Sequence, residues 1–570
     1  MKTVRSQLEE RLRLALDALG LDPDAAEVAI ATDRRFGDYQ SNAAMVLARR
    51  ERKNPRELGA AIAARIDVSG IASPPEIAGA GFLNFRLTDA FLKECGESLL
   101  GDPRCGLEPA AQPQTIVIDF SSPNVAKPMH VGHIRSTILG DCLARIARFL
   151  GHTVITDNHI GDWGTQFGKV IYGWKHLLDR PALERDPIPE LLRLYREVNT
   201  AEEDDESLRK TVREELVKLQ SGDAGNLAIW NQVVTLSWKE FEKLYALLDV
   251  TFDERLGESF YNDALAPLVE RLIAAGIARE SEGAICVFFP HIPALAERPC
   301  LIRKSDGGFL YATTDLATLE YRMRRWKPGA IWYVTGAPQA LHFQQIFEVA
   351  RRMGLEVAAE HVAFGSILGE DRKIMKTRSG ENVQLGDVLR EAVERASAII
   401  AEKNAGLPPS EAAEIARTVG IGAVKYAELS QHRMTDYVFS WDKMLSFQGN
   451  TAPYLQNAYV RIRSIFRKAG DDDDAGTSAI LLSDPAERGL ILQLLQFAEV
   501  VPAILTDFRP NLLANYLYEL ATAFHAFYEA CPVLKSEGAL RASRLALCGV
   551  TAHTLKTGLD LLGISCPERM

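Results

Sequence analysis

Two histidines three positions apart, His130 and His133, lie in the segment IDFSSPNVAKPMHVGHIRSTILGD, residues 118–141. The segment reads as a buried strand, a loop and a helix start, with Gly132 between the histidines. A helix N-terminus offers free N–H groups and partial positive charge, so it attracts phosphate. Two imidazoles on one helix face can donate hydrogen bonds to the same phosphate oxygens. The pattern predicts a phosphate site, with Lys127 nearby and Gly132 leaving room for a nucleotide.

A later stretch, GEDRKIMKTRSGENVQL at residues 369–385, could bring further positive charge to the phosphates. Its candidates are Lys373, Lys376 and Arg378. A solvated basic loop is the alternative, and the sequence leaves open which lysine would contact a phosphate.

Several acids lie where a cationic ligand could meet them. A cationic ligand would need carboxylates to compensate its charge. Asp119 ends the first expected strand, and Glu258 lies in GESFYND. Tyr311 and Asp315 are four residues apart at the start of an expected helix, hence on one face. Each acid alone is more often a surface or salt-bridge residue.

The elements that must position these groups form an alternating pattern. TIVIDF reads as a buried strand, IRSTILGDCLARIARFL as a helix and TVITD as a second strand, which predicts parallel pairing with a right-handed crossover. Later segments, AICVFF, AIWYVTG and VAAEHVAFGSIL, alternate with helices and predict that the sheet resumes. The charged helical stretch at about 173–257 would then be an insertion between two halves of a doubly wound domain.

The two ends of the chain differ from this middle part. The first hundred residues open with helical periodicity and close on AGAGFLNFRL, where alternation and glycines predict a strand. The last 130 residues carry the apolar spacing of a helical bundle. We therefore predict four regions: an α+β domain at 1–108, an α/β domain at 109–386, a helical connector at 387–436 and an all-α domain at 437–570.

Composition is that of a soluble globular protein, with 47% hydrophobic and 25% charged residues, and the cysteine pattern makes the cytoplasm the expected location. The 8 cysteines form no C-x-x-C pair, which favours reduced thiols and argues against a cysteine zinc site. We find no signal peptide and no apolar run near the ~20 residues that span a bilayer. The net charge of −11 is unusual for an RNA-binding protein, but phosphate contacts need only a local basic face. Such a face is offered by Arg461, Arg463, Arg467 and Lys468.

Several segments in order resemble one family. SSPNVAKPMHVGH resembles the signature of class I aminoacyl-tRNA synthetases, and the arginyl-tRNA synthetases in particular. The resemblance extends over FGDYQSN (36–42), NHIGDWGTQFG (158–168), GESFYND (257–263), LYATTD (310–315), NTAPYLQNAYVRIRS (450–464) and the terminal PERM. It implies an α/β fold: a doubly wound, Rossmann-like parallel-sheet catalytic domain with a helical insertion, an N-terminal α+β domain and a C-terminal all-α bundle.

The resemblance also implies an activity, the ATP-dependent activation of L-arginine to arginyl-adenylate and its transfer to the 3′ end of tRNA. It assigns catalysis to His130, His133, Lys127 and Lys376, and ATP binding to these residues with Gly132, Lys373 and Arg378. It places Asp119, Glu258, Tyr311 and Asp315 around the guanidinium, and Asn124 and Gln339 at the α-amino and carboxylate end. ATP with Mg²⁺ is the implied cosubstrate, with no tightly bound metal or organic cofactor.

Transfer RNA is the implied macromolecular partner, with no DNA or membrane partner and a monomeric chain. The first domain would bind the tRNA elbow, with Gln40 and Asn42 as candidates. Stacking aromatics and basic residues usually read single-stranded bases. The candidates for this role in the last domain are Tyr454, Tyr459, Arg461 and Met570.

Three alternatives share parts of this pattern. A small-molecule adenylyltransferase can have the same histidine motif, although such chains usually lack a large helical C-terminal domain. A synthetase-like protein could bind tRNA without catalysis, although such proteins usually lose the histidines and the acid pocket first. A class I enzyme for lysine would also need an acidic pocket, and only a comparison of charging with the two amino acids separates it from the arginine enzyme.

Overall fold

The computed structural model describes residues 2–369, 372–373, 375, 383–404, 406–470 and 479–570. The chain divides into two compact units. One comprises Met1–Ala110, Glu402–Val419 and Ser446–Met570; the other comprises Ala111–Ala401 and Gly420–Leu445. Each unit is taken by itself below.

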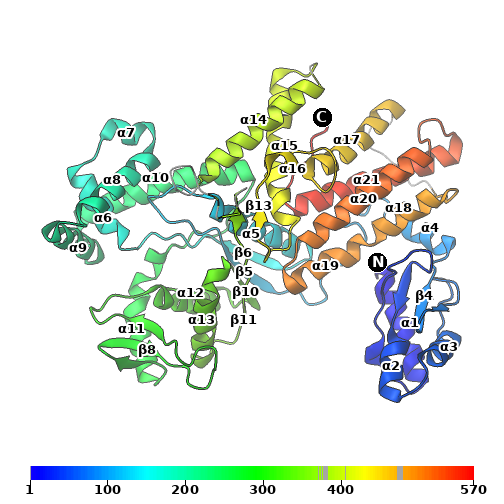
Figure 1. Cartoon of the computed structure of the whole chain (residues 1–570), viewed down its shortest axis with the longest axis horizontal. Helices are drawn as coiled ribbons and strands as arrows, with labels where there is room; N and C mark the ends of the chain where they lie inside the picture. The colour runs from blue at the N-terminus through cyan, green and yellow to red at the C-terminus, as the bar shows by residue number, and fades with distance from the viewer. Residues whose placement is uncertain (1, 370–371, 374, 376–382, 405, 471–478) are drawn as a thin grey trace. The chain divides into compact units, whose positions relative to one another are not determined.

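The second unit is built on a four-stranded parallel sheet in the order β11-β10-β5-β6 (Figure 1). Its strands are β5 (Thr115–Phe120), β6 (Thr153–Asp157), β10 (Ala330–Val334) and β11 (Ala358–His361). Helix α5 (Val131–Phe149) crosses from β5 to β6, as the sequence predicts. β5 and β10 are apolar and almost wholly buried because a parallel sheet is covered on both faces. The predicted α/β fold class is confirmed.

Three further helices share a hydrophobic core with the sheet: α11 (Asn262–Ala274), α12 (Tyr311–Trp326) and α13 (Ala340–Arg352). Val117 of β5 and Ile331 of β10 lie in this core with Leu316 of α12 and Ile346 of α13. Packing of α12 against the sheet matters for function, because α12 begins with two of the predicted arginine ligands.

The prediction for AICVFF is wrong in one respect. β8 (Ala284–Val287) belongs to a separate antiparallel sheet with β7 (Arg279–Ser281) and β9 (Cys300–Arg303). Glu282 and Gly283 join β7 to β8, with φ of 52° and 80°. Two positive φ values in a two-residue loop produce a tight hairpin, so β8 returns along β7 rather than entering the parallel sheet.

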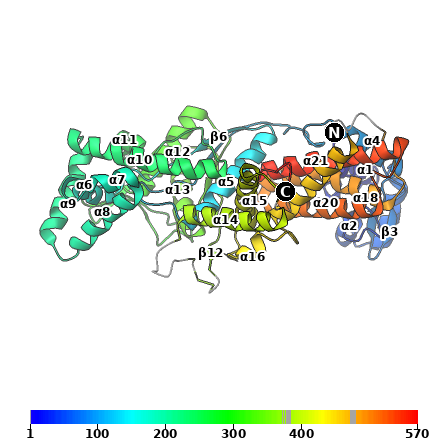
Figure 2. The ribbon, with the colours of Figure 1, turned by 90° about the horizontal axis from the view of Figure 1, so that it is seen from above.

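The expected helical insertion follows β6 and gathers at one end of this unit (Figure 2). Its helices are α6 (Gln166–His176), α7 (Arg180–Arg185), α8 (Pro187–Ala201), α9 (Glu206–Gln220) and α10 (Ala224–Leu248). They enclose a core of their own around Phe167, Ile171, Leu191 and Val233. The short 3₁₀ helix η2 (Glu258–Tyr261) follows the insertion, and η3 (Ala337–Gln339) precedes α13.

A short parallel pair follows the main sheet, β12 (Ile367–Leu368) with β13 (Tyr437–Val438). Between them in sequence run α14 (Leu385–Lys403) and α15 (Pro409–Leu429), and α16 (Trp441–Met444) comes after β13. The lysine-containing stretch therefore begins directly after β12 and ends at the start of α14.

The first unit opens with an antiparallel sheet, order β1-β2-β4-β3. Its strands are β1 (Ala29–Ile30), β2 (Tyr39–Ser41), β3 (Glu76–Ala78) and β4 (Phe82–Phe85). Around them lie α1 (Val4–Ala18), η1 (Pro23–Ala25), α2 (Ala43–Glu51), α3 (Pro55–Arg65) and α4 (Asp89–Ser98). The strand expected in AGAGFLNFRL is β4, and the α+β class of this part is confirmed.

The remainder of the first unit is all helical. It consists of α17 (Ala452–Ala469), α18 (Pro485–Leu495), α19 (Phe497–Asp507), α20 (Asn511–Ala530) and α21 (Gly538–Leu561). Thr451 caps α17 by accepting the Tyr454 amide, and Gly470 ends it at a φ of 74°. The predicted bundle is confirmed.

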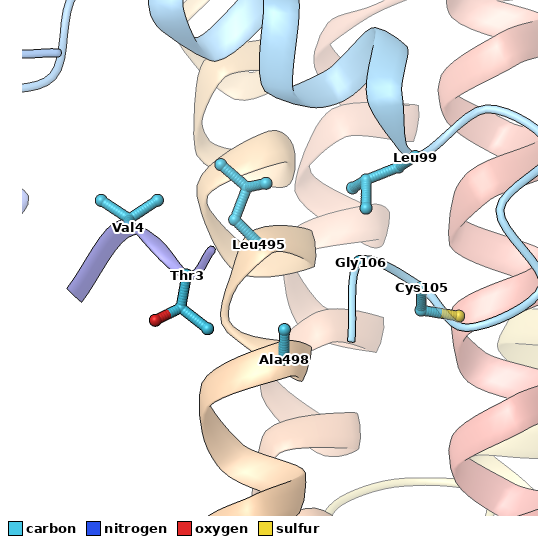
Figure 3. A pocket seen from close by; sticks show the side chains of 7 residues that line it. All are labelled: Thr3, Val4, Leu99, Cys105, Gly106, Leu495 and Ala498. Atoms are coloured by element: carbon cyan, nitrogen blue, oxygen red, sulfur yellow. The ribbon is translucent and has the colours of Figure 1, made fainter. Parts of the chain in front are cut away.

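One apolar run was underestimated from the sequence. Pro485–Asp507, which is α18 and α19 together, is long and apolar enough to cross a membrane by length and composition. Within the bundle, 67% of its most apolar window is buried, which is typical of a core helix. A small hollow beside it is lined by Thr3, Val4, Leu99, Cys105, Gly106, Leu495 and Ala498 (Figure 3). This lining holds no charged side chain, so the hollow is a packing defect and not a site for chemistry.

Candidate active site

The two histidines of the first motif form a reciprocal cap on α5. The amide of Gly132 donates to Nδ1 of His130 at 3.1 Å, and the amide of His130 donates to Nδ1 of His133 at 3.1 Å. The ring centroids are 4.1 Å apart. An amide N–H can only donate, so each Nδ1 is the accepting nitrogen and each ring proton is on Nε2. The pair therefore presents two Nε2–H donors.

Both imidazoles are neutral near pH 7. The pKa of His133 is lowered to about 3, chiefly by burial and also by the neighbouring His130. Burial also lowers the pKa of His130 below its ordinary value. These side chains can thus offer hydrogen bonds to a phosphate without bringing positive charge.

The expectation of free backbone N–H groups at this helix start is wrong. Besides the two amides bound to imidazoles, the Val131 amide donates to the Val383 carbonyl at 2.9 Å, and the His133 amide donates to the His130 carbonyl at 2.8 Å. The reason is the histidine cap itself, which satisfies the helix from within. A phosphate here would meet side-chain donors and the helix dipole rather than bare amides.

Glycine is required at position 132 for a more specific reason than access for a nucleotide. A Cβ at this position would lie 2.8 Å from Cε1 and 2.9 Å from Nδ1 of the His130 ring. Only glycine lets the imidazole fold over the first turn of α5. Gly132 therefore allows the His130 ring to keep its capping position.

The end of the lysine-containing stretch lies beside the histidine motif. Val383–Leu385 pairs with Met129–Val131: the Val131 amide donates to the Val383 carbonyl, and the Leu385 amide donates to the Met129 carbonyl. Lys373 is exposed, and its carbonyl accepts the Gly369 amide at 2.8 Å. The predicted Lys376 and Arg378 lie outside the described residues.

Lys127 lies on the other side of the loop, toward the insertion. Its Nζ is 4.9 Å from the centroid of the Tyr195 ring of α8, and Lys169 lies over the same ring. The loop itself is strained, because Ser121, Ser122 and Ala126 have φ of 71°, 42° and 62°. Non-glycine residues in this region cost of order 1–3 kcal/mol each and persist only where neighbours hold them.

Neighbours from α10 hold this loop. The Ala126 amide donates to Ser237 Oγ at 3.0 Å. Tyr245 Oη lies 2.8 Å from Ser121 Oγ and accepts from the Asn158 side-chain amide at 2.9 Å. The insertion thus takes part in shaping the loop that ends at the histidines.

The acids gather beside the loop, at the carboxyl ends of β5 and β6 and the start of α12. Asp315 Oδ2 is 2.5 Å from Nε2 of His342, a residue of α13. Asp162 accepts from the Ser259 amide at 2.8 Å and from its hydroxyl at 2.7 Å, which fixes the turn that carries Glu258.

The protonation state of Glu258 depends on what surrounds it. Its pKa is raised to about 7, chiefly by burial and also by Asp162 and Asp315, with His159 opposing them. Burial would lower the pKa of His159, but the carboxylates around it outweigh burial and the pKa lies above its ordinary value. Glu258 therefore gains a proton readily unless a cation enters the pocket.

Asp119 is engaged within the protein. Its Oδ2 accepts from Nη2 of Arg322 at 2.7 Å, and its Oδ1 accepts from the Ser122 hydroxyl at 3.1 Å. The same Arg322 nitrogen donates to Asp157 at 2.7 Å. Burial would lower the Arg322 pKa, but the two aspartates raise it well above its ordinary value.

The remaining predicted ligands border this cluster. Tyr311 is 67% exposed at the first position of α12, one turn before Asp315. Asn124 is exposed and pairs with Gly161, where a Cβ would lie 2.3 Å from the Asn124 side-chain oxygen. Gln339 is exposed at the end of η3. These side chains are unhindered at the same edge of the sheet.

With this geometry in hand, the chain matches three family models. Residues 97–441 match the catalytic domain of class I tRNA synthetases (R), 455–570 match the DALR anticodon binding domain, and 4–87 match the arginyl-tRNA synthetase N-terminal domain. The chain belongs to the arginyl-tRNA synthetase family. It is an enzyme of class I, as the resemblance implies.

Individual relatives agree over the whole chain. The arginine–tRNA ligase of Cellvibrio japonicus is 46% identical over 580 residues and covers 100% of both chains. The crystal structure of arginyl-tRNA synthetase from Plasmodium falciparum has a TM-score of 0.85 at 30% identity and 100% coverage of both chains. The Thermus thermophilus arginyl-tRNA synthetase has a TM-score of 0.83 at 28% identity, over 99% of this chain and 100% of that one.

In the arginyl-tRNA synthetase N-terminal domain, FGDYQSN divides into inward and outward residues. Asp38 accepts two hydrogen bonds from Arg488 of α18, and the Tyr39 hydroxyl donates to Glu499 of α19 at 2.9 Å. Gln40 is half-buried and Asn42 is exposed, with its side chain making no cap bond. The motif therefore fixes this domain to the bundle and leaves Asn42 free at the surface.

In the DALR domain, the predicted contacts also divide. Tyr459 is buried and its hydroxyl donates to Glu568 at 2.9 Å. Tyr454 is half-buried, Arg461 is exposed and Met570 is half-buried. Tyr459 thus helps to hold the C-terminal segment, whereas the other three remain accessible.

Sequence reasoning missed residues in both units. His342 and Arg322 lie outside the chosen motifs, and only their spacing from Gln339 and Asp315 could have suggested them. On α20, the helical stripe Tyr518, His525 and Tyr528 faces α17: the Tyr454 ring lies 5.5 Å from Tyr518 and 5.3 Å from His525. Arg461 lies 5.8 Å from the Tyr528 ring.

Proposed function

We propose that this chain activates L-arginine with ATP and transfers it to the 3′ end of an arginine-accepting tRNA. The observation that carries the proposal is the meeting of two features at one sheet edge. One is a pair of neutral imidazoles with their Nε2–H groups unused by the backbone. The other is a group of acids around Glu258, whose pKa is raised by burial and by Asp162 and Asp315.

In the activation step, the arginine carboxylate attacks the α-phosphorus of ATP and pyrophosphate leaves. His130 and His133 would donate Nε2–H bonds to phosphate oxygens, where charge builds up in the transition state. Because both rings are neutral, they stabilise by hydrogen bonding, and positive charge must come from elsewhere. Lys127, Lys373, Lys376 and Arg378 are the proposed sources.

Arginine would be selected by charge and shape. The guanidinium would bind Glu258 and Asp315, with Tyr311 closing one side, and Asn124 and Gln339 would receive the α-amino and carboxylate end. A forked, permanently charged group suits two carboxylates better than the point charge of lysine does. The family resemblance adds Asp119 to the guanidinium ligands.

We further propose that Mg²⁺ arrives with ATP. The phosphates themselves would supply the oxygens that magnesium prefers. The proposal includes a monomeric, cytoplasmic enzyme with no tightly bound organic cofactor.

Transfer RNA would contact both ends of the chain. Residues 1–108 would bind the elbow through Gln40 and Asn42, and residues 437–570 would read the anticodon, with 109–386 as catalytic domain and 387–436 as connector. Tyr454 and Arg461 lie in an aromatic and basic strip with His525 and Tyr528, which suits stacking of unpaired bases. Met570 is a further contact, whereas Tyr459 would act by holding the terminus.

Exchange of labelled pyrophosphate into ATP tests the activation step. We expect exchange that needs arginine, measured with and without tRNA. Exchange driven instead by lysine, or by a pantetheine or nicotinamide substrate, would assign the pocket to another enzyme. Binding of tRNA without any charging would leave a binding protein.

The tRNA contacts need a separate measurement. Tyr454→Ala and Arg461→Ala should each raise the Kd for tRNA, the tyrosine by about fivefold or more because a base stack is worth ~1–3 kcal/mol. Tyr459→Phe, which removes only the bond to Glu568, is the matched control and should change tRNA affinity less. Equal effects of the three variants would contradict this assignment.

A further inference from the structure

Two aspartates are forced together at the carboxyl end of the parallel sheet. Asp119 of β5 and Asp157 of β6 are register partners on adjacent strands. Their side chains are 8% and 0% exposed. Two carboxylates this close and this buried repel each other strongly unless a cation or a proton lies between them.

Arg322 supplies that cation. Its side chain is 0% exposed, and one nitrogen, Nη2, donates to both aspartates at 2.7 Å. The other oxygens are occupied too: Asp119 Oδ1 accepts from Ser122, and Asp157 Oδ1 accepts from the Leu256 amide at 3.2 Å. Each oxygen of Asp119 thus already has a partner within the protein.

Arg322 stands on the helix that carries two proposed substrate ligands. Tyr311, Asp315 and Arg322 are spaced by four and seven residues along α12, which places them on one face. The bond from Arg322 to the strand ends therefore fixes how α12 is seated against the sheet. The seat of α12 in turn sets where the Asp315 carboxylate lies.

We propose that Arg322 is an internal guanidinium that takes up Asp119 and Asp157 and acts as a positioning residue for arginine selection. The carboxylates that then serve the substrate are those of Glu258 and Asp315, of which Asp315 also bonds His342. Arg322 also sets the charge of the pocket, because without it two further acids would be uncompensated. The inference rests on the proposed arginine activation and revises the role of Asp119 within it.

The first test compares conservative variants by arginine-dependent pyrophosphate exchange. Arg322→Lys keeps the charge on a shorter side chain that reaches the two aspartates less well, so the KM for arginine should rise about tenfold while kcat and the KM for ATP change little. Asp119→Asn should raise the arginine KM by less than about threefold, whereas Asp315→Asn should raise it at least about tenfold. Arg325→Lys, at an exposed position of the same helix, is the matched control.

The second test uses charge. Burial, with Asp162 and Asp315, raises the pKa of Glu258 against the opposing effect of His159, and its ionisation should set the pH at which arginine binds well. Arg322→Gln makes the pocket more negative, so the midpoint of the arginine KM against pH should move upward. Asp119→Asn makes it less negative and should move the midpoint downward. A merely structural role would not move the two midpoints in opposite directions.

Failure of this inference can be distinguished from failure of the proposed function. If Asp119→Asn raises the arginine KM as much as Asp315→Asn, Asp119 is a substrate ligand and the inference fails. If Arg322→Lys lowers thermal stability but leaves the arginine KM unchanged, Arg322 is only structural and the inference also fails. Should Arg322→Gln not fold, the lysine and asparagine variants still decide. Absence of arginine-dependent exchange in the unaltered chain would instead reject the proposed function.

Discussion

The phosphate side and the arginine side of the site are built in opposite ways. His130 and His133 come from one contiguous motif and satisfy each other and the helix start through short local bonds. The acids come from separate elements: Asp119 from β5, Glu258 from η2 and Asp315 from α12. The imidazoles are neutral and their Nδ1 atoms already accept hydrogen bonds, whereas the acids carry negative charge that a bound arginine would compensate.

The difference assigns different tasks to the two sides. A neutral, prearranged donor pair costs little to maintain and acts when charge develops on the phosphate, so it should influence kcat. An acidic pocket is unfavourable when empty and becomes favourable when a cation enters, so it should influence the KM for arginine. The variants below test whether the two sides act separately on kcat and on the arginine KM.

The largest expected effect is on the phosphate side. His133→Ala should lower the activation rate by about a hundredfold with the arginine KM nearly unchanged, because a transition-state donor is lost. Pre-steady-state or exchange kinetics would measure it. His133→Asn, which can keep one donor near this place, should recover part of the rate. An unchanged rate in the alanine variant would remove the phosphate role.

On the arginine side, Asp315→Asn should raise the arginine KM by roughly ten- to a hundredfold, because a charge-assisted bond of ~1.5–3 kcal/mol is weakened. Saturating arginine should restore most of kcat. His342→Gln, which keeps a donor toward Asp315, should have a smaller effect in the same direction. A fall in kcat that arginine cannot restore would contradict the division of tasks.

The pH dependence follows from Glu258. Its pKa is raised to about 7, so the group is neutral below that pH and becomes a carboxylate above it. Arginine needs the carboxylate, so the arginine KM should fall about tenfold as pH rises from 6 to 8. Steady-state kinetics over this range measure the slope. Glu258→Gln should have a high KM and lose the slope, and a retained slope would assign the titration to another group.

The smallest effects come from a matched pair of glycines. In Gly132→Ala the new Cβ would approach the His130 ring, and in Gly257→Ala it would lie 2.5 Å from an oxygen of Asp162. We expect a few-fold fall in kcat for the first and a few-fold rise in arginine KM for the second. Exchange assays at varied arginine concentration measure kcat and the arginine KM separately. A KM effect from Gly132→Ala with a kcat effect from Gly257→Ala would contradict the division into two sides.

Much of this fold was predictable because its signals are local. β5 and β10 are nearly continuous apolar runs, α17 has a cap at Thr451 and a stop at Gly470, and both histidines lie at the start of the helix that follows β5. The hairpin at Gly283 was missed because a short apolar strand has the same composition in a parallel or an antiparallel sheet. Only the turn before it distinguishes the two.

The electrostatics of the pocket were less predictable. Asp119 is an acid at a strand end, as expected, but its partner Arg322 is 203 residues away in sequence. Similarly, Tyr459 lies on the same helix as Tyr454, yet its hydroxyl binds a residue 109 positions later. Helical and strand periodicities place a side chain on a face; which charge or ring meets it there depends on long-range packing that no local pattern encodes.

The most direct test of the account is pyrophosphate exchange by the double variant His133→Ala, Asp315→Asn, titrated with arginine beside the two single variants. The two-sided site predicts that the double variant combines the low kcat of the first with the high arginine KM of the second, each at its single-variant size. If both substitutions depress the same constant, or if either leaves both constants unchanged, the division of the site into a phosphate side and an arginine side is contradicted.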